Sequence, residues 1–355
     1  TASPYVITVT REPSDDAALA SLTLSSGSLK PDFKISELNY TASVTHQTDS
    51  ITVTPTADDP NATITVNGVP VASGAASQAV PLVVGDNVIN ILVTAQDLAT
   101  HANYSITVTR AASSDATLST LTLSSGVLIP GFQPGVLSYT ADVANATDTI
   151  TVTPTATEPG ATILINGIHV DSGTTSQPFP LTVGSNPLNI VVTAPDTTTS
   201  TTYVLTVNRA PSSDALLSSL TVSNGNLDQA FDPKLLVYTE SVIHTVDSIT
   251  VTPTADDPTA TITVDGAPVS SGTASAPISL AVGDNVIPII VTAQDGVTIT
   301  TYTITVTRAP STDATLKALA ISSGTLLPGF QPTVLSYPAT VPNATSSITV
   351  TPTAN

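Results

Sequence analysis

One segment of 19 residues returns along the chain at a constant spacing of 99 residues, and this repetition restricts the possible folds more than any other feature. The segment "SITVTPTADDPNATITVNG" occupies residues 50–68, and it returns as "SITVTPTADDPTATITVDG" at residues 248–266. A looser copy, "TITVTPTATEPGATILING", occupies residues 149–167, and a fourth copy begins at Ser347. Self-similarity at such a period indicates an array of similar domains.

The repeat predicts three whole domains with a fragment at each end. We expect β-sandwich repeats at residues 12–110, 111–209 and 210–308. Residues 1–11 correspond to the last strand of a preceding repeat, and residues 309–355 to the first three strands of a truncated fourth repeat. Odd copies resemble odd copies and even copies resemble even ones, so the duplicated unit is predicted to be a block of two domains.

The two fragments lack the strands that would cover their apolar faces. Uncovered strand edges and small pieces of sheet are unfavourable in water. We therefore expect adjoining protein to complete both ends, either as a continuation of the same array or as a neighbouring copy that donates strands. Because the chain begins with Thr1 and contains no Met, we expect it to be an interior or processed piece, with any secretion signal outside it.

Within each repeat, the alternation of apolar and hydroxyl residues predicts an all-β domain. Residues 39–44, "NYTASV", and residues 51–56, "ITVTPT", have the two-residue period of half-buried strands. Pro55 cannot donate a ladder hydrogen bond, so its strand should end there or lie at an edge. Asn67-Gly68 predicts a hairpin because both turn residues need positive φ. We expect seven or eight short strands per repeat and no helices, which is typical of an immunoglobulin-like sandwich.

The later part of each repeat supplies the apolar centre of the predicted domain. The run "VINILVTA" at residues 88–95 is apolar on both faces and is predicted to be a central strand, and residues 104–110 are predicted to close the repeat. All eight Tyr, and every Phe except Phe179, occupy positions that recur between copies, so they are interpreted as core. This leaves no spare aromatic platform for stacking sugars or bases.

The composition argues against several classes of function. The 27 Asp and Glu against 8 Lys and Arg give a net charge of −19, which disfavours nucleic acid or an anionic membrane as a partner. The longest apolar run is too short to cross a bilayer, so no membrane insertion is expected. The absence of Cys removes disulfides and thiol nucleophiles. The four His have no partner at triad or ligand spacing, so no catalytic residue is predicted.

The joints between repeats are the candidate functional positions. Each joint runs from the Arg at the end of the closing strand to the Asp five residues later, and such short joints predict neighbouring domains stacked end to end as a rod. An ion pair that locks the joint is one interpretation, and a solvated strand end is the other, because exposed pairs contribute only about 0–1 kcal/mol. The candidate joint residues are Arg110, Asp115, Arg209, Asp214, Arg308 and Asp313.

Calcium is the one cofactor that the acidic residues could hold. The pairs Asp58-Asp59 and Asp256-Asp257 offer carboxylate oxygens, which Ca²⁺ prefers. The middle copy has Thr157-Glu158 at these positions, and the multi-ligand linker motifs of true cadherins are missing. A carboxylate that caps a turn before Pro60 is the simpler interpretation. We therefore predict no cofactor, with these four Asp as the candidates for calcium.

A longer pattern shared by the copies resembles a known family. It runs "L-x-x-L-x-[LVI]-S-x-G-x-L", then "Y-T-A-x-V", "I-T-V-T-P-T-A", "A-T-I-x-[VI]-[ND]-G" and "Y-x-[IL]-T-V-x-R". This pattern resembles the cadherin-like β-sandwich repeats of large prokaryotic surface and secreted proteins, over the whole chain. The resemblance implies immunoglobulin-like sandwiches that serve as spacer, stalk or interaction modules, without catalytic residues.

The sequence and the resemblance together predict an extracellular or cell-surface, non-enzymatic protein. The leading hypothesis is a structural repeat region of an extracellular filament or fibre that self-associates end to end. The alternatives are the passive stalk of a giant cell-surface adhesin and a carbohydrate- or calcium-binding accessory module. Glycans are a further possible partner, since N-glycosylation sequons occur at Asn39, Asn61, Asn103, Asn145 and Asn343.

Overall fold

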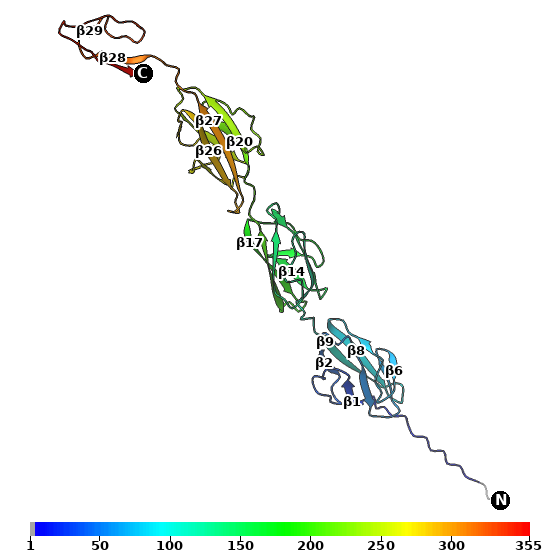
Figure 1. Ribbon diagram of the computed structural model, residues 1–355. Coiled ribbons are helices and arrows are strands. Elements are labelled where there is room, and N and C mark those ends of the chain that lie inside the picture. The colour runs from blue at the N-terminus through cyan, green and yellow to red at the C-terminus, as the bar shows by residue number, and fades with distance from the viewer. Residues whose placement is uncertain (1–3) are drawn as a thin grey trace. The chain divides into compact units, whose positions relative to one another are not determined.

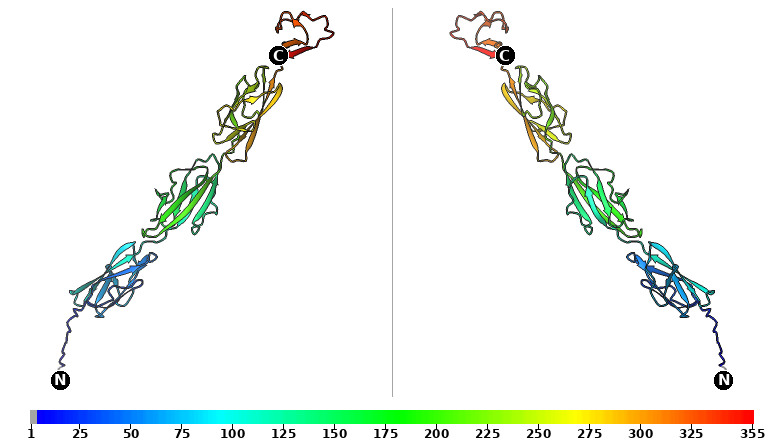
Figure 2. Two further views of the ribbon diagram at one scale, coloured as in Figure 1. Left: turned by 90° about the vertical axis from the view of Figure 1, so that its left-hand side faces the viewer. Right: turned by 90° about the vertical axis from the view of Figure 1, so that its right-hand side faces the viewer.

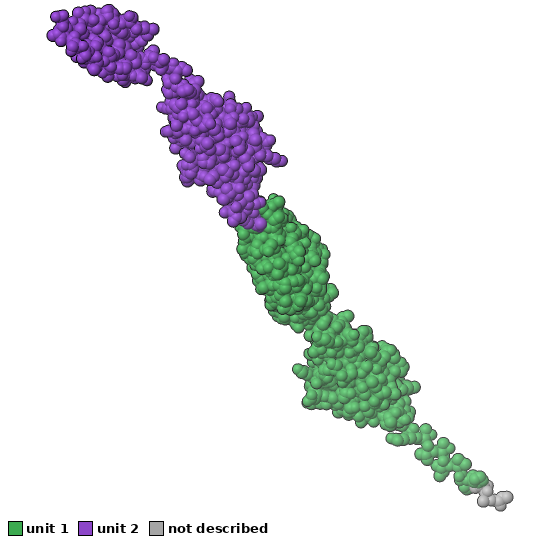
Figure 3. Space-filling model, viewed as in Figure 1, with its two compact units in different colours: residues 1–209 green, residues 210–355 purple. Residues whose placement is uncertain are grey.

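A computed structural model describes residues 4–355, and in this range every regular element is a β-strand (Figures 1 and 2). The chain divides into two compact units, Thr1–Arg209 and Ala210–Asn355 (Figure 3). Residues 1–3 of the fragment predicted at residues 1–11 lie outside the described residues. The prediction of an all-β chain is confirmed.

Each whole repeat contains nine strands, which the structure places at nearly the same register in all three copies. The first repeat has β1 (Leu19–Leu24), β2 (Asn39–Val44), β3 (Ser50–Ile51), β4 (Val53–Ala57), β5 (Thr63–Val66), β6 (Val69–Val71), β7 (Val80–Pro81), β8 (Gly85–Thr94) and β9 (His101–Arg110). The second has β10 (Leu118–Leu123), β11 (Ser138–Val143), β12 (Thr149–Ile150), β13 (Val152–Ala156), β14 (Thr162–Ile165), β15 (Ile168–Val170), β16 (Phe179–Pro180), β17 (Gly184–Thr193) and β18 (Ser200–Arg209). The third has β19 (Leu217–Val222), β20 (Val237–Val242), β21 (Ser248–Ile249), β22 (Val251–Ala255), β23 (Thr261–Val264), β24 (Ala267–Val269), β25 (Ile278–Ser279), β26 (Gly283–Thr292) and β27 (Ile299–Arg308).

A five-stranded sheet forms the larger layer of each repeat. Its strand order in the first repeat is β2-β9-β8-β5-β6, and the same order returns as β11-β18-β17-β14-β15 and β20-β27-β26-β23-β24. The pair β2–β9 is parallel, whereas the other neighbours are antiparallel. The opposite layer consists of the two-stranded pairs β1–β4 and β3–β7. The predicted central strand is confirmed, because β8 lies between β9 and β5.

The single strand predicted over residues 51–56 is divided in the structure. The segment before Thr52, β3, pairs with β7, and the segment after it, β4, pairs with β1. The Thr52 N–H donates to Ser25 Oγ at 2.9 Å, outside either ladder, because the chain changes its pairing partner at this residue. Pro55 lies within β4 and pairs with Leu22 of β1 in a sheet of two strands, which makes β4 an edge strand as its Pro requires.

The predicted hairpin turn is also confirmed. Asn67 and Gly68, between β5 and β6, have φ of 48° and 79°, and the equivalent pairs in the other repeats have the same signs. Asn67 tolerates this conformation because its short side chain bonds locally, and Asn67 Oδ1 accepts from the Asn90 N–H at 2.9 Å. The turn thus ties the hairpin to the neighbouring strand β8.

Each whole repeat has its own apolar core. Tyr104, Tyr203 and Tyr302 are fully buried at equivalent positions. Phe179, which the repeat pattern did not identify, is buried as well, at 6% exposure. Although the run is apolar on both faces, the outer face of β8 is open to solvent, since Val88 is 56% exposed. Only the inner face of this sheet is covered by the second layer.

The terminal fragments have few partners within the chain. Residues 4–11 form no strand, and Tyr5 is 95% exposed. In the last fragment, β28 (Leu316–Ile321) pairs with β31 (Val350–Ala354), and β29 (Thr325–Leu326) pairs with β30 (Ala339–Thr340). Val350 is 55% exposed. Completion of these fragments by adjoining protein stays a prediction.

Candidate inter-domain joint

The Arg at the end of each closing strand binds backbone carbonyls of its own repeat. Arg110 donates from Nε and Nη2 to His46 O at 2.9 and 2.6 Å, and from Nη1 to Leu82 O at 2.9 Å. Arg308 repeats this arrangement in the third repeat, and Arg209 makes the corresponding bonds from Nε and Nη1 in the second. The guanidinium therefore binds two loops at the end of the five-stranded sheet. We refer to it as the arginine clamp.

The Asp five residues after each Arg caps the start of the next repeat. Asp115 Oδ1 accepts from the N–H and Oγ1–H of Thr117 at 2.9 and 2.6 Å. Asp214 accepts from the Leu216 N–H at 2.8 Å, and Asp313 bonds its own Thr as Asp115 does. Among residues 4–355, no ion pair joins Arg110 to Asp115 or Arg308 to Asp313. The two residue types thus occupy the two sides of the joint with separate hydrogen bonds.

Backbone hydrogen bonds anchor the first linker on both sides. The Ala111 N–H donates to Val44 O at 3.0 Å, which continues the first repeat. The carbonyl of Ser113 accepts from the Asp196 N–H at 3.0 Å, which belongs to the second repeat. Ser113 is only 5% exposed. Ala112 is therefore the single residue between the two anchoring bonds.

The loop that receives the linker is built on an Asp that the sequence reasoning missed. Asp196 Oδ1 accepts from the Thr198 and Thr199 N–H groups at 2.9 and 2.8 Å, and Oδ2 accepts from Thr199 Oγ1 at 2.6 Å. The Thr199 hydroxyl is the largest cause of a lowered pKa for this carboxyl. Asp97 and Asp295 hold the same turn in the other repeats. The signal in the sequence was their recurrence after "VTAQ" or "VTAP".

The buried tyrosines of the closing strands hold the first strand of the same repeat. Tyr203 Oη accepts from the Leu118 N–H at 3.0 Å and donates to Pro134 O at 2.9 Å. Tyr104 and Tyr302 accept from Leu19 and Leu217 in the same way. Leu118 is the first residue of β10, shortly after the linker. This hydrogen bond therefore fixes the point at which the chain enters the core.

One pair of side chains within the first unit spans two repeats. His46 Nε2 lies 3.8 Å from Glu158 Oε2, and both side chains are 29% exposed. At this distance and exposure the pair contributes at most about 1 kcal/mol, and only while His46 is protonated. It adds to the backbone anchors of the first linker without replacing them.

The four calcium candidates lie at turns, where two of them cap the backbone. Asp59 Oδ1 accepts from the Asn61 N–H at 2.9 Å, and this bond is the largest cause of its lowered pKa. Asp257 Oδ1 accepts from the Thr259 N–H and hydroxyl at 2.8 and 2.6 Å. The backbone N–H of Asp58 and of Asp256 continues the pairing with the first strand. Over residues 4–355, no group of three or more His, Cys, Asp or Glu is placed to hold a metal. The prediction of no cofactor, with these four Asp as the candidates for calcium, stays a prediction.

These observations define the class as a tandem β-sandwich protein in which the first linker is short and anchored to both neighbouring repeats. The chain belongs to the cadherin-like beta sandwich domain family, which matches residues 19–111, 115–210 and 217–309. The family resemblance predicted from the sequence is thereby confirmed. In the part of the chain that the structure describes, no helix is long and apolar enough to cross a membrane.

A curated relative and several solved structures are similar to parts of the chain. A putative membrane protein of Evansella cellulosilytica is 41% identical over 97 residues, which is 27% of this chain and 14% of that protein. The EC1-3 fragment of Drosophila N-cadherin is 10% identical, with a TM-score of 0.30, over 77% of this chain and 99% of that one. An I-band fragment of titin is 10% identical, with a TM-score of 0.24, over 74% and 92%. The similarity to these two structures is too distant to bear on function.

Proposed function

We propose that the chain is a non-enzymatic structural repeat region of an extracellular filament or fibre, in which repeats associate end to end. The observation that carries this proposal is the first linker, which is bonded to the first repeat at Ala111 and to the second at Ser113. A joint with one unanchored residue suits a material that transmits tension between its domains. It suits a flexible tether poorly, since tethers need many free residues.

The position of the closing strand supports the same function. Tension applied to the linker acts directly on the end of β9, which lies between β2 and β8. The β9 ladder pairs six residues with β2 and all ten of its own residues with β8. A pull along the strand loads these hydrogen bonds together instead of opening them one at a time. The arginine clamp at Arg110 adds two loop carbonyls at the point where the force enters.

Coupling between the first two repeats can be measured with pairs of spin labels. The chain contains no Cys, so Ser43→Cys and Ser138→Cys introduce unique labelling sites on exposed strand positions of β2 and β11. We expect a narrow distribution of distances between the labels. Inserting Gly-Ser-Gly after Ala112 should broaden it, whereas the same insertion after Tyr5 is the control. A distribution that is already broad without the insertion would contradict a tension-transmitting joint.

The second candidate function is the passive stalk of a cell-surface adhesin. Whether the chain assembles into fibres distinguishes the filament from this stalk. The stalk is favoured by the Evansella relative, a putative membrane protein of which this chain spans only a seventh. Electron microscopy of the native material at several concentrations is the test. Continuous fibres with an axial repeat of one or two domains support the filament. Separate particles at every concentration would refute the filament and favour the stalk.

A further inference from the structure

The third repeat contains a buried carboxyl group that the other whole repeats lack. Glu240 lies in β20 at the inward-facing position that Ala42 and Ala141 occupy in β2 and β11. Its exposure is only 2%, and neither carboxyl oxygen has a hydrogen-bond partner. Burying an ionised carboxylate without a partner is strongly unfavourable, so this position requires either a protonated group or a change of structure.

The Glu240 side chain separates β20 from the loop that normally lies on this strand. In the first repeat a Cβ added to Gly27 would lie 2.9 Å from Ser43 O, so the loop backbone lies directly on the strand. At the equivalent Gly225 the three atoms nearest to an added Cβ all belong to the Glu240 side chain, and Oε1 is the nearest of them. The φ angle of this glycine changes from 77° to 154°. The carboxyl group thus acts as a wedge under the loop.

The same loop, residues 223–231, is held by fewer backbone bonds than its equivalents. In the first repeat Lys30 and Thr41 exchange two backbone hydrogen bonds, each of 2.8 Å. In the third repeat Asp228 N–H donates to Thr239 O at 2.8 Å, but the Thr239 N–H donates instead to the side chain of Gln229. One of the two backbone bonds is therefore replaced by side-chain bonds, since the Thr239 hydroxyl also accepts from Gln229 Nε2 at 3.0 Å and donates to Asp228 Oδ2 at 2.7 Å.

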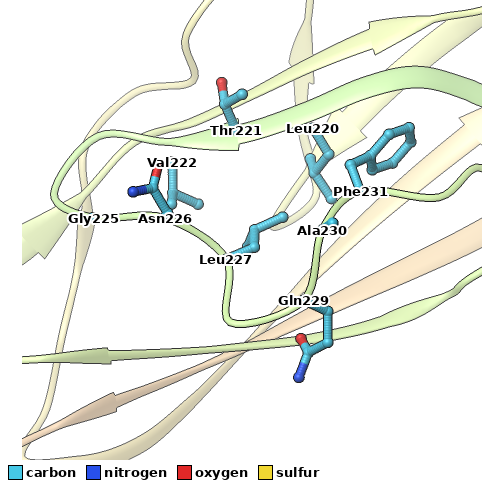
Figure 4. Close-up of a pocket in the computed structure, with 9 residues that line it drawn as sticks. All are labelled: Leu220, Thr221, Val222, Gly225, Asn226, Leu227, Gln229, Ala230 and Phe231. Atoms are coloured by element: carbon cyan, nitrogen blue, oxygen red, sulfur yellow. The ribbon is translucent and has the colours of Figure 1, made fainter.

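A pocket of about 270 Å³ lies between β19 and the loop, and Gly225 lines it (Figure 4). Leu220 and Leu227 point toward one another across this space, whereas Gln229 points away from it (Figure 4). Detaching the loop would expose these apolar side chains to solvent. Gly225 thus lies next to the Glu240 carboxyl group and also lines the pocket.

We propose that residues 223–231 form a pH-gated loop, which is closed in acid and open toward neutral pH. The carboxyl group of Glu240 is the group whose ionisation opens it. While its carboxyl group is protonated, Glu240 can stay under the loop. When it ionises, the charge is drawn toward water, and the shortest path displaces Gly225. Opening presents an apolar surface around Leu220 and Leu227 in the third repeat. This inference is independent of the proposed filament function.

The charges around Glu240 set the direction of the switch. Burial raises the pKa of the Glu240 carboxyl above its ordinary value of 4.5, and the negative charge of Asp228 raises this pKa further. Among the residues described, Asp228 on the loop is the charged group that acts on Glu240. For a group with a raised pKa in the folded state, the stabilisation is complete below the ordinary pKa and is lost as the pH rises through the folded-state pKa. Each unit of raised pKa changes the opening equilibrium about tenfold.

Hydrogen exchange of the full chain at pH 4.5 and 7.5 tests the proposal. After correction for intrinsic rates, we expect protection in residues 223–231 to fall about tenfold or more toward neutral pH. The equivalent loops at residues 25–33 and 124–132 are internal controls, and their protection should stay constant. Equal protection of residues 223–231 at both pH values would overturn the proposal.

Two variants separate the charge of Glu240 from its size. Glu240→Gln keeps the wedge without a titrating group, and Glu240→Ala restores the residue of the other whole repeats. Protection of residues 223–231 should become independent of pH in both variants. A pH dependence that persists in Glu240→Gln would refute the role of this carboxyl. Asp228→Asn should move the midpoint to lower pH, and a midpoint that does not move would refute the contribution of Asp228.

Discussion

Replacement of Arg110 by Met removes the arginine clamp while keeping most of the apolar stem of the side chain. The variant loses two bonds to His46 O and one to Leu82 O. A hydrogen bond from a charged donor contributes about 1.5–3 kcal/mol when buried. Arg110 is half-buried and two of its bonds share one acceptor. We therefore expect a loss of about 2–3 kcal/mol in the free energy of unfolding of the first repeat.

Thermal unfolding of the full chain measures this loss. For a domain of this size, about 2–3 kcal/mol corresponds to a decrease of roughly 10–20 °C in the Tm of the affected repeat. Hydrogen exchange assigns the transition, because only peptides from residues 12–110 should lose protection. Arg11→Met is the matched control: Arg11 has the same register but is exposed. It should leave every transition unchanged.

A comparison with Asp115→Asn distinguishes the clamp from a joint-locking ion pair. Asp115 bonds to Thr117 of the second repeat, so its replacement should weaken only the second transition. If Asp115→Asn lowers the first transition as Arg110→Met does, the two residues act as a pair. That result would refute separate hydrogen bonds on the two sides of the joint. An unchanged first transition in Arg110→Met would refute a stabilising role of the arginine clamp.

Three further changes test the second repeat. Tyr203→Phe leaves the buried Leu118 N–H without its partner, so chemical denaturation should show a loss of about 1–3 kcal/mol. Gly126→Ala should lower the Tm of the second repeat in calorimetry, because φ is 80° and the new Cβ would lie 3.0 Å from Asp142 O. Acid should open the turn at Asp196: its pKa is lowered in the folded state, so its stabilisation is present above the ordinary value of 3.8 and is lost as the pH falls through the folded-state pKa. Hydrogen exchange between pH 5 and pH 2 measures this loss, and Asp196→Asn should remove the pH dependence.

The parts of the fold that depend on local residue chemistry could be predicted from the sequence. The hairpin at Asn67-Gly68 follows from the conformational freedom of two residues, and the inward face of β2 follows from alternation. The division of residues 51–56 at Thr52 could not be predicted in this way. It depends on which distant strand pairs with each half, and both halves have the same alternating pattern.

The joint was located by the sequence, but its chemistry was not. Arg110 stands at a recurring position, which made it a candidate, and an Asp five residues away suggested its partner. Its actual partners are backbone carbonyls, and a carbonyl leaves no trace in the sequence because every residue has one. Glu240, by contrast, could have been found from the sequence alone. It is a charged residue at an inward position of a strand where the copies have Ala.

The constant length of the repeat follows from these hydrogen bonds to backbone groups. The carbonyls that meet Arg110 belong to two loops, and the linker meets a third loop at Asp196. An inserted residue in any of these loops would move a backbone group out of its hydrogen bond. A substitution elsewhere in the chain could not restore that bond. Recent duplication would also give equal lengths, but it would leave the loops similar in sequence. Residues 96–100, "QDLAT", and residues 195–199, "PDTTT", share only Asp and the last Thr and still have the same length. Length has therefore been kept while the residues changed, which is expected when geometry between backbone groups is the constraint.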